Sequence, residues 1–166
     1  MPEEINQAYT ITDTAYVAGF FDGEGCVRIN KSRSQGNTHN PETPHYTMSV
    51  QLVNTDLHVL EYVQSMFGGK LVMRNPDKYT REGHKTKYNL NWYATSARTV
   101  LQQLLPYLRV KRKQAELAIY FQDSIITTST RQTSQLDLEL REILYQTSMS
   151  LKHQTSTAQE ICQGGE

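Results

Sequence analysis

The sequence has few cysteines, no long hydrophobic run and no excess of either charge. Its two cysteines, Cys26 and Cys162, lie far apart and match neither a disulfide framework nor a metal-binding spacing, which indicates free thiols in a reducing compartment. Residues 1–13 are acidic and polar, without the basic flank and apolar stretch of a secretory signal or a membrane span. We expect a protein that is not secreted and has no membrane partner, in a prokaryotic cytoplasm or an organelle matrix.

The length of 166 residues is enough for one domain whose core needs no disulfide. We expect that domain over residues 1–151, followed by a polar, flexible tail over residues 152–166. The balanced charge hides an uneven distribution. Residues 26–113 hold fourteen Lys and Arg against five acidic residues, which leaves three basic and twelve acidic residues elsewhere. A basic middle between acidic ends favours a polyanion-binding surface over scattered, solvated charge.

The spacing of apolar residues predicts the order helix, two strands, helix, two strands, and then helices to the end of the chain. The first helix is expected over residues 14–22, with Thr12 or Asp13 as its cap and Gly23 and Gly25 after it. The other predictions are strands at 26–30, 45–54, 70–75 and 85–94, a loop at 32–44, a helix from 56 to 67, another at 96–105, and two more up to about 149.

The predicted strands alternate apolar and polar side chains. Val27 and Ile29 share one face of the first strand, while Arg28 and Asn30 share the other. The remaining strands repeat this pattern, and the polar set is rich in Arg, Lys, Asn, Gln, Ser and Thr. Such a sheet buries one face under helices and presents the other to a hydrogen-bonding partner, which predicts an α+β fold.

Residues 16–25 read Tyr-Val-Ala-Gly-Phe-Phe-Asp-Gly-Glu-Gly. A glycine inside a helix costs about 1 kcal/mol relative to alanine, and close approach of another helix would compensate for it. We expect four aromatic and aliphatic residues of this helix in the core: Tyr16, Val17, Phe20 and Phe21. A stripe of small residues at helical spacing is left for a partner helix: Ala15, Ala18, Gly19 and Asp22.

This segment resembles the LAGLIDADG motif of homing endonucleases. Three later segments resemble landmarks of that family in the family's order, so the resemblance covers about residues 12–125: Asn54-Thr55-Asp56, Phe67-Gly68-Gly69-Lys70 and Leu105-Pro106-Tyr107-Leu108. The chain is similar to members that carry the motif once and form homodimers. The resemblance implies an αββαββα fold with C-terminal helices and a curved, antiparallel, four-stranded DNA-binding sheet.

The resemblance also implies the catalytic residues. Glu24, as the last acidic residue of the motif, would ligate Mg²⁺ between two subunits, and Gly23 would offer a backbone carbonyl; Mn²⁺ is an alternative, and Ca²⁺ should support binding without cleavage. Lys111 would stabilise charge or help to activate water, with Lys113 as the fallback. Asn54 would position the attacking water, and His58 is a weaker candidate.

The implied reaction is the cutting of both strands of a long, pseudo-palindromic DNA target by a homodimer. Arg pairs well with guanine, and Asn or Gln with adenine. The predicted base-reading residues are Arg28, Asn30, Ser32, Ser49, Gln51, Arg74, Lys87, Asn89 and Asn91. The predicted phosphate-binding residues are Lys31, Arg33, Lys78, Arg81, Lys85 and Lys113.

Two alternatives remain at the level of sequence. A catalytically inactive DNA-binding relative, or an intron maturase that binds RNA, would share the fold. An unrelated α+β binding module with an acidic turn would show no salt-dependent affinity for duplex DNA.

Overall fold

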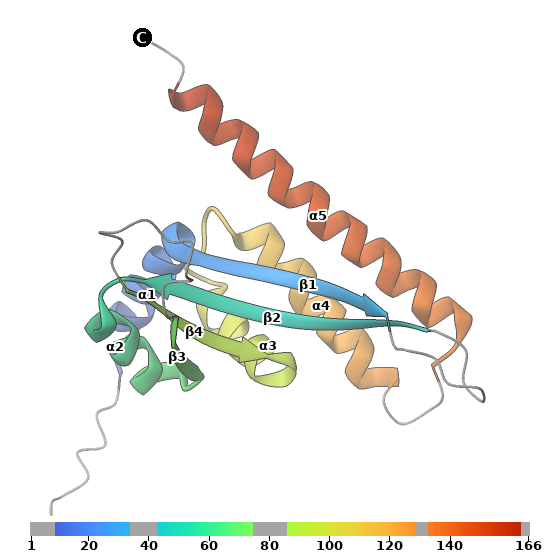
Figure 1. Cartoon of the computed structure of the whole chain (residues 1–166), viewed down its shortest axis with the longest axis horizontal. Helices are drawn as coiled ribbons and strands as arrows, with labels where there is room; N and C mark the ends of the chain where they lie inside the picture. The colour runs from blue at the N-terminus through green and yellow to red at the C-terminus, as the bar shows by residue number, and fades with distance from the viewer. Residues whose placement is uncertain (1–8, 34–42, 75–85, 129–132, 164–166) are drawn as a thin grey trace, which may run out of the picture.

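The computed structural model describes residues 9–33, 43–74, 86–128 and 133–163, and for residues 128 and 153–163 it describes the backbone alone. Figure 1 shows helices covering one side of an antiparallel sheet. The helices are α1 (Ile11–Glu24), α2 (Leu57–Phe67), α3 (Ala94–Leu104), α4 (Arg112–Thr128) and α5 (Gln135–Gln163). The predicted α+β fold, with its curved four-stranded sheet, is confirmed.

The sheet runs in the order β1-β2-β4-β3, so β2 and β4 are central and β1 and β3 form the edges. Its strands are β1 (Gly25–Arg33), β2 (Pro44–Asn54), β3 (Lys70–Arg74) and β4 (Lys87–Tyr93). The hairpin strands β1 and β2 are the long ones, and they pair from Gly25 opposite Leu52 to Arg33 opposite Pro44. Residues 32, 33 and 44, which were predicted in a loop, therefore belong to these strands.

The core lies between the sheet and the helix layer. The predicted apolar faces of β1, β2 and β4 are confirmed, because Val27, Ile29, Val50 and Trp92 are almost fully buried among residues from α1, α2, α3 and α4. The short strand β3 is the exception, since its residues are exposed or half-buried. The indole N–H of Trp92 also donates a hydrogen bond to the carbonyl of Phe67, at the end of α2, over 3.1 Å. This bond satisfies the buried indole nitrogen and fixes α2 against β4.

The first helix begins earlier than predicted. Thr10 is its N-cap, and a capping box joins the Thr10 side chain to the backbone of Asp13 and the Asp13 carboxylate to the backbone N–H of Thr10. Asp13 is thus the third helical residue and not the cap, and Thr12 lies within the helix. The capping box satisfies two amides that would otherwise lack partners at the helix start.

The last helix is longer than predicted. It continues past Met149 to Gln163, so the backbone of residues 152–163, expected as a flexible tail, is helical. Figure 1 shows the C-terminal part of α5 extending away from the sheet. In the part of the chain that the structure describes, no helix is long and apolar enough to cross a membrane.

Candidate active site and nucleic-acid interface

The face of the sheet opposite the helices carries polar side chains from all four strands. Arg28 lies opposite Ser49, Gln51 opposite Asn91, and Arg74 opposite Lys87 in the strand register. Asn30 donates to the Ser49 hydroxyl over 2.9 Å, and the Gln51 amide donates to Asn91 over 3.0 Å. The side chains of these two hydrogen-bonded pairs are held by one another and keep further donors and acceptors for a partner.

Asn89 occupies the middle of this face. It lies opposite Val53 of β2 and Val72 of β3. Its side-chain oxygen is the buried side-chain atom that lacks a hydrogen-bond partner among the described residues. A buried acceptor without a partner is costly, so this oxygen is a polar atom that the described part of the chain does not satisfy.

Two predicted phosphate-binding residues of β1, Lys31 and Arg33, do not share a side of the strand with its polar residues Arg28 and Asn30. Lys31 pairs with Tyr46 in the register and therefore lies on the helix side of the sheet. Its ammonium is 2.7 Å from the Glu142 carboxylate of α5, which also accepts a short hydrogen bond from the Tyr46 hydroxyl. This position corrects the prediction for Lys31. Arg33 lies two residues further along, on the same side of the strand as Lys31, but it is exposed because it is the last residue of β1.

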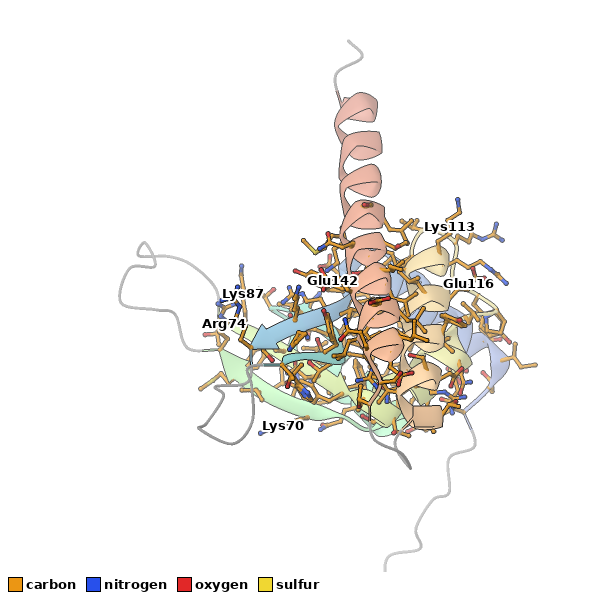
Figure 2. The ribbon with its side chains drawn as sticks, turned by 90° about the vertical axis from the view of Figure 1, so that its right-hand side faces the viewer. Lys70, Arg74, Lys87, Lys113, Glu116 and Glu142 are labelled. Carbon is orange, nitrogen blue, oxygen red and sulfur yellow. The ribbon has the colours of Figure 1, made fainter. Side chains whose placement is uncertain are left out.

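The other predicted phosphate-binding residues lie elsewhere. Lys113 is exposed near the start of α4, and Figure 2 shows it on the other side of α5 from Lys87 and Arg74. Three more predicted residues, Lys78, Arg81 and Lys85, lie outside the described residues.

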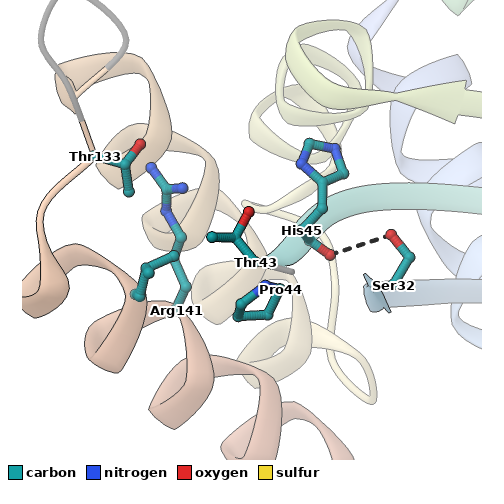
Figure 3. A pocket seen from close by; sticks show the side chains of 7 residues that line it. Ser32, Thr43, Pro44, His45, Thr133 and Arg141 are labelled. Carbon is teal, nitrogen blue, oxygen red and sulfur yellow. Dashed lines mark hydrogen bonds between the residues drawn. The ribbon is translucent and has the colours of Figure 1, made fainter. Parts of the chain in front are cut away.

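A hollow at the far end of the sheet contains Ser32. It lies where β1 ends, β2 begins and α5 starts, and Thr43, His45 and Arg141 are among its lining residues (Figure 3). The Ser32 hydroxyl donates to the His45 carbonyl over 3.4 Å. Ser32 thus lies on the polar face, at the end farthest from α1.

The small-residue stripe of α1 is only partly exposed. Gly19 is exposed and Ala15 half-buried, whereas Ala18 is completely buried in its own core. Tyr16, expected in the core, is 56% exposed, and its ring makes an edge contact with Tyr62. The predictions for Ala18 and Tyr16 are therefore wrong: the exposed stripe is rotated by about one residue from the predicted one.

Asp22 belongs to its own chain and not to an open interface. Its carboxylate accepts hydrogen bonds from the backbone amides of Arg109, Val110 and Lys111, over 2.7, 3.2 and 2.9 Å. The segment before α4 is therefore tied to the end of α1. An anionic side chain also suits these amides because they lie at the start of a helix.

Lys111 completes this connection from the other side. Its ammonium donates a short hydrogen bond to the backbone carbonyl of Asp22, which is one of the carbonyls left without a partner at the end of α1. Burial lowers the pKa of Lys111, and the nearby acidic groups of Asp22, Cys26 and Glu24 oppose that shift. The predicted catalytic lysine thus lies next to the end of the motif, half-buried.

Glu24 is the exposed last residue of α1. It lines a hollow of about 270 Å³ with Asn54, Thr55 and Lys87. Two of the predicted catalytic residues, Glu24 and Asn54, therefore meet there. The Asn54 side-chain oxygen accepts from the backbone N–H of Asp56 over 2.8 Å, just before α2, which leaves its NH₂ group for other partners.

Glu24 and Gly23 fit a divalent cation in part. Both are exposed at a helix C-terminus, where carbonyl oxygens and a carboxylate provide the hard oxygen ligands that Mg²⁺ prefers. No group of three or more His, Cys, Asp or Glu residues gathers within the described ranges, and Glu24 is the one carboxylate among the described residues that line the hollow. His58 is exposed, its ring lies 3.4 Å from Glu61, and it is not among the residues that line the hollow.

The contribution of Lys87 to the hollow was missed by sequence reasoning, which assigned this residue to base reading. The alternation in β4 correctly placed it on the polar face. Only the strand order, with β4 next to β2, brings it beside Asn54 and Glu24.

Comparison with known proteins identifies the family. The family model for the LAGLIDADG endonuclease matches residues 17–121. A search of curated proteins found no match. Solved structures with a similar fold include the homing endonuclease I-CvuI in complex with its target, at 23% identity and a TM-score of 0.67 over 86% of this chain and 85% of that one.

Two further solved structures have a similar fold, and this chain covers most of the first but less than half of the second. The archaeal intron-encoded homing endonuclease I-Vdi141I, complexed with DNA, is 12% identical, with a TM-score of 0.67 over 84% of each chain. I-SmaMI, bound to cleaved DNA, is 13% identical, with a TM-score of 0.62 over 83% of this chain but 44% of its own. The matched residues include the motif, the polar sheet and the segment before α4. The chain therefore belongs to the LAGLIDADG endonuclease family.

Proposed function

We propose that this protein is a site-specific DNA endonuclease that acts as a homodimer with divalent metal bound at Glu24. The observation that carries the proposal is the hollow in which Glu24 meets Asn54 and Lys87, at one end of an open polar sheet face. Family membership supports it, as do the DNA complexes of I-CvuI and I-Vdi141I.

The open face supports recognition of duplex DNA. Its Arg, Asn and Gln side chains have the donors and acceptors that read base edges in the major groove, which is wide enough for a sheet. Arg28, Asn30, Gln51 and Asn91 are already held in position by neighbouring groups. Ordered side chains lose less entropy on binding, which favours specific recognition of a long target.

The proposed dimer would join two copies through α1. A Cβ atom added at Gly19 or Gly23 meets nothing within 4 Å, whereas one added at Gly25 would lie 2.4 Å from the Phe21 ring. The fold of one chain explains Gly25 but gives no reason for the other two glycines. Close packing against a second α1 would provide one, and it would bring two Glu24 carboxylates together.

The comparison of lengths supports the same arrangement. This chain corresponds to most of I-CvuI but to less than half of I-SmaMI. Some chains with this fold therefore have the length of one copy, and others have room for two. Such a family is consistent with an active unit that contains two copies of the fold. A two-fold dimer would recognise a pseudo-palindromic target.

Hydrolysis would form a bond from a water oxygen to phosphorus, break the bond to the leaving oxygen, and pass a water proton to that oxygen through solvent. Mg²⁺, when bound by Glu24 and the carbonyl of Gly23, would neutralise charge on the phosphate and lower the pKa of water. Asn54 can donate from its NH₂ group to the attacking water or to a phosphate oxygen. Complexes of I-CvuI were studied with 2 mM Ca and 2 mM Mg, which is consistent with divalent ions in this family.

The proposal is tested by selecting cleaved sites from a random duplex library in Mg²⁺, with Mn²⁺ and Ca²⁺ in parallel. We expect double-strand breaks at one related group of long, pseudo-palindromic sites with Mg²⁺ and Mn²⁺, and binding without breaks in Ca²⁺. A chain that binds the library at low salt but cuts nothing with any metal would contradict the nuclease. Preferential binding to structured RNA would instead favour the maturase.

A further inference from the structure

Lys87 is the first residue of β4 and lies on the open face of the sheet. It lines the same hollow as Glu24 and Asn54. Its neighbour across the strands is Arg74, the last residue of β3, and Figure 2 shows these two labelled side chains close to each other at one side of the molecule. Two cations therefore face outward at the end of the sheet next to the motif.

This pair has no stabilising role in the chain alone. Like charges opposite each other on neighbouring strands are destabilising. No carboxylate in the described part of the chain forms an ion pair with Lys87 or Arg74. Both side chains are exposed. An anion placed on this end of the open face would relieve the repulsion and gain from both charges.

Other groups near the hollow are already engaged. The Lys111 ammonium, which is close enough to Glu24 to feel its charge, donates to the carbonyl of Asp22. The oxygen of Asn54 accepts from Asp56. Of the described residues that line the hollow, Lys87 carries the positive charge, and it shares the hollow with the carboxylate proposed to hold metal.

We infer that Lys87 contacts the phosphate that is cut beside Glu24 and neutralises charge that develops on its non-bridging oxygens, instead of reading a base. Lys87 keeps its proton throughout and contributes charge and a hydrogen bond. The inference rests on the proposed function. Charge placed where negative charge grows in the transition state lowers the barrier, so its loss should reduce the rate of cleavage more than the affinity.

The experiment uses the full chain and the duplex site that the wild-type protein selects. Lys87→Met, Lys87→Gln and Lys87→Arg are compared with Lys70→Met, which removes the same charge from the same sheet face outside the hollow. Affinity is measured in Ca²⁺, and the single-turnover cleavage rate is measured in Mg²⁺ with enzyme in excess. Circular dichroism confirms that each variant is folded.

We expect Lys87→Met and Lys87→Gln to lower the cleavage rate by about 100-fold, the usual effect of losing one group that stabilises developing charge. Lys87→Arg should stay within about tenfold of the wild type, and Lys70→Met within about twofold. Library selection with Lys87→Met should return the same sites as the wild type.

Two results would overturn the inference while leaving the nuclease intact. One is an unchanged single-turnover rate in Lys87→Met and Lys87→Gln. The other is a changed base at one target position in the reselected sites, which would make Lys87 a base-reading residue. If the wild-type protein itself cuts no duplex, the proposed function fails, and this role for Lys87 fails with it.

Discussion

The two faces of the sheet place the same residue type in different surroundings, as two lysines show. Lys31 of β1 lies on the covered face, where it is bound to Glu142 and Tyr46. Lys87 of β4 lies on the open face, beside Glu24, opposite another cation. Both were predicted to contact DNA. Because successive side chains of a strand point to opposite faces, the position of a residue in the alternation decides what its charge can do.

The largest difference between the faces should be in stability. Trp92→Ala on the covered face should lower the free energy of unfolding by about 3–5 kcal/mol, because a buried aromatic ring and its hydrogen bond are lost. Asn91→Ala, the adjacent residue on the open face, should cost about 1 kcal/mol. Urea denaturation measures both. Equal losses of unfolding free energy would contradict the division of the sheet into a covered face and an open face.

The second prediction concerns the connection between α1 and α4. Asp22→Ala leaves three backbone amides without their anionic acceptor and should cost about 1.5–3 kcal/mol in urea denaturation. The matched control is Asp123→Ala, which breaks a partly exposed ion pair with Arg98 and should cost under about 1 kcal/mol. A smaller loss of unfolding free energy for Asp22→Ala than for the control would contradict this structural role of Asp22.

The third prediction separates the needs of one chain from those of a dimer. Gly19→Ala should stabilise the isolated chain by up to about 1 kcal/mol, since the added Cβ meets no atom and alanine favours a helix. Gly19→Lys should prevent close packing of two α1 helices and yield an inactive monomer. Light scattering over a range of concentrations measures the mass. A Gly19→Lys variant that remains a dimer, or that cuts DNA as a monomer, would contradict the proposed interface.

The smallest predicted effect is in the pH dependence of the covered face. Hydrogen bonds from Gln146, Lys31 and Tyr46 lower the pKa of Glu142 from 4.5 to about 2. A carboxyl whose pKa is depressed by folding stabilises the protein above its unfolded pKa, and this contribution is lost as the pH falls from about 4.5 to about 2. In Glu142→Gln the decrease in Tm over this range should be shallower. An identical decrease in both proteins would rule out the effect.

The fold could be predicted well because it depends on local patterns. The alternation in β1, β2 and β4 correctly identified the buried face. The ends of elements were less predictable, since a capping box at Thr10 and Asp13 moved the start of α1 by one turn. The polar residues after Met149 gave no sign that α5 continues to Gln163.

The site could be predicted only in part, because its parts come from different elements. The motif predicted a catalytic role for Glu24, and the end of the second strand predicted one for Asn54. The structure places both residues in one hollow, and their roles stay predictions. The bonds of Asp22 to residues 109–111 join positions that are 87 to 89 residues apart in the sequence, and no sequence spacing reveals them. The surroundings of Lys31 and Lys87 likewise depend on which elements pack beside β1 and β4.

Cleavage of the selected duplex by Glu24→Gln is the most direct test of the central claim, that Glu24 holds the metal for cutting. The measurement compares the variant with the wild type in Mg²⁺, after equal binding of both to the duplex has been established in Ca²⁺. We predict that Glu24→Gln binds the site but produces no double-strand breaks. Breaks formed at the wild-type rate would contradict the assignment of Glu24 as the metal ligand.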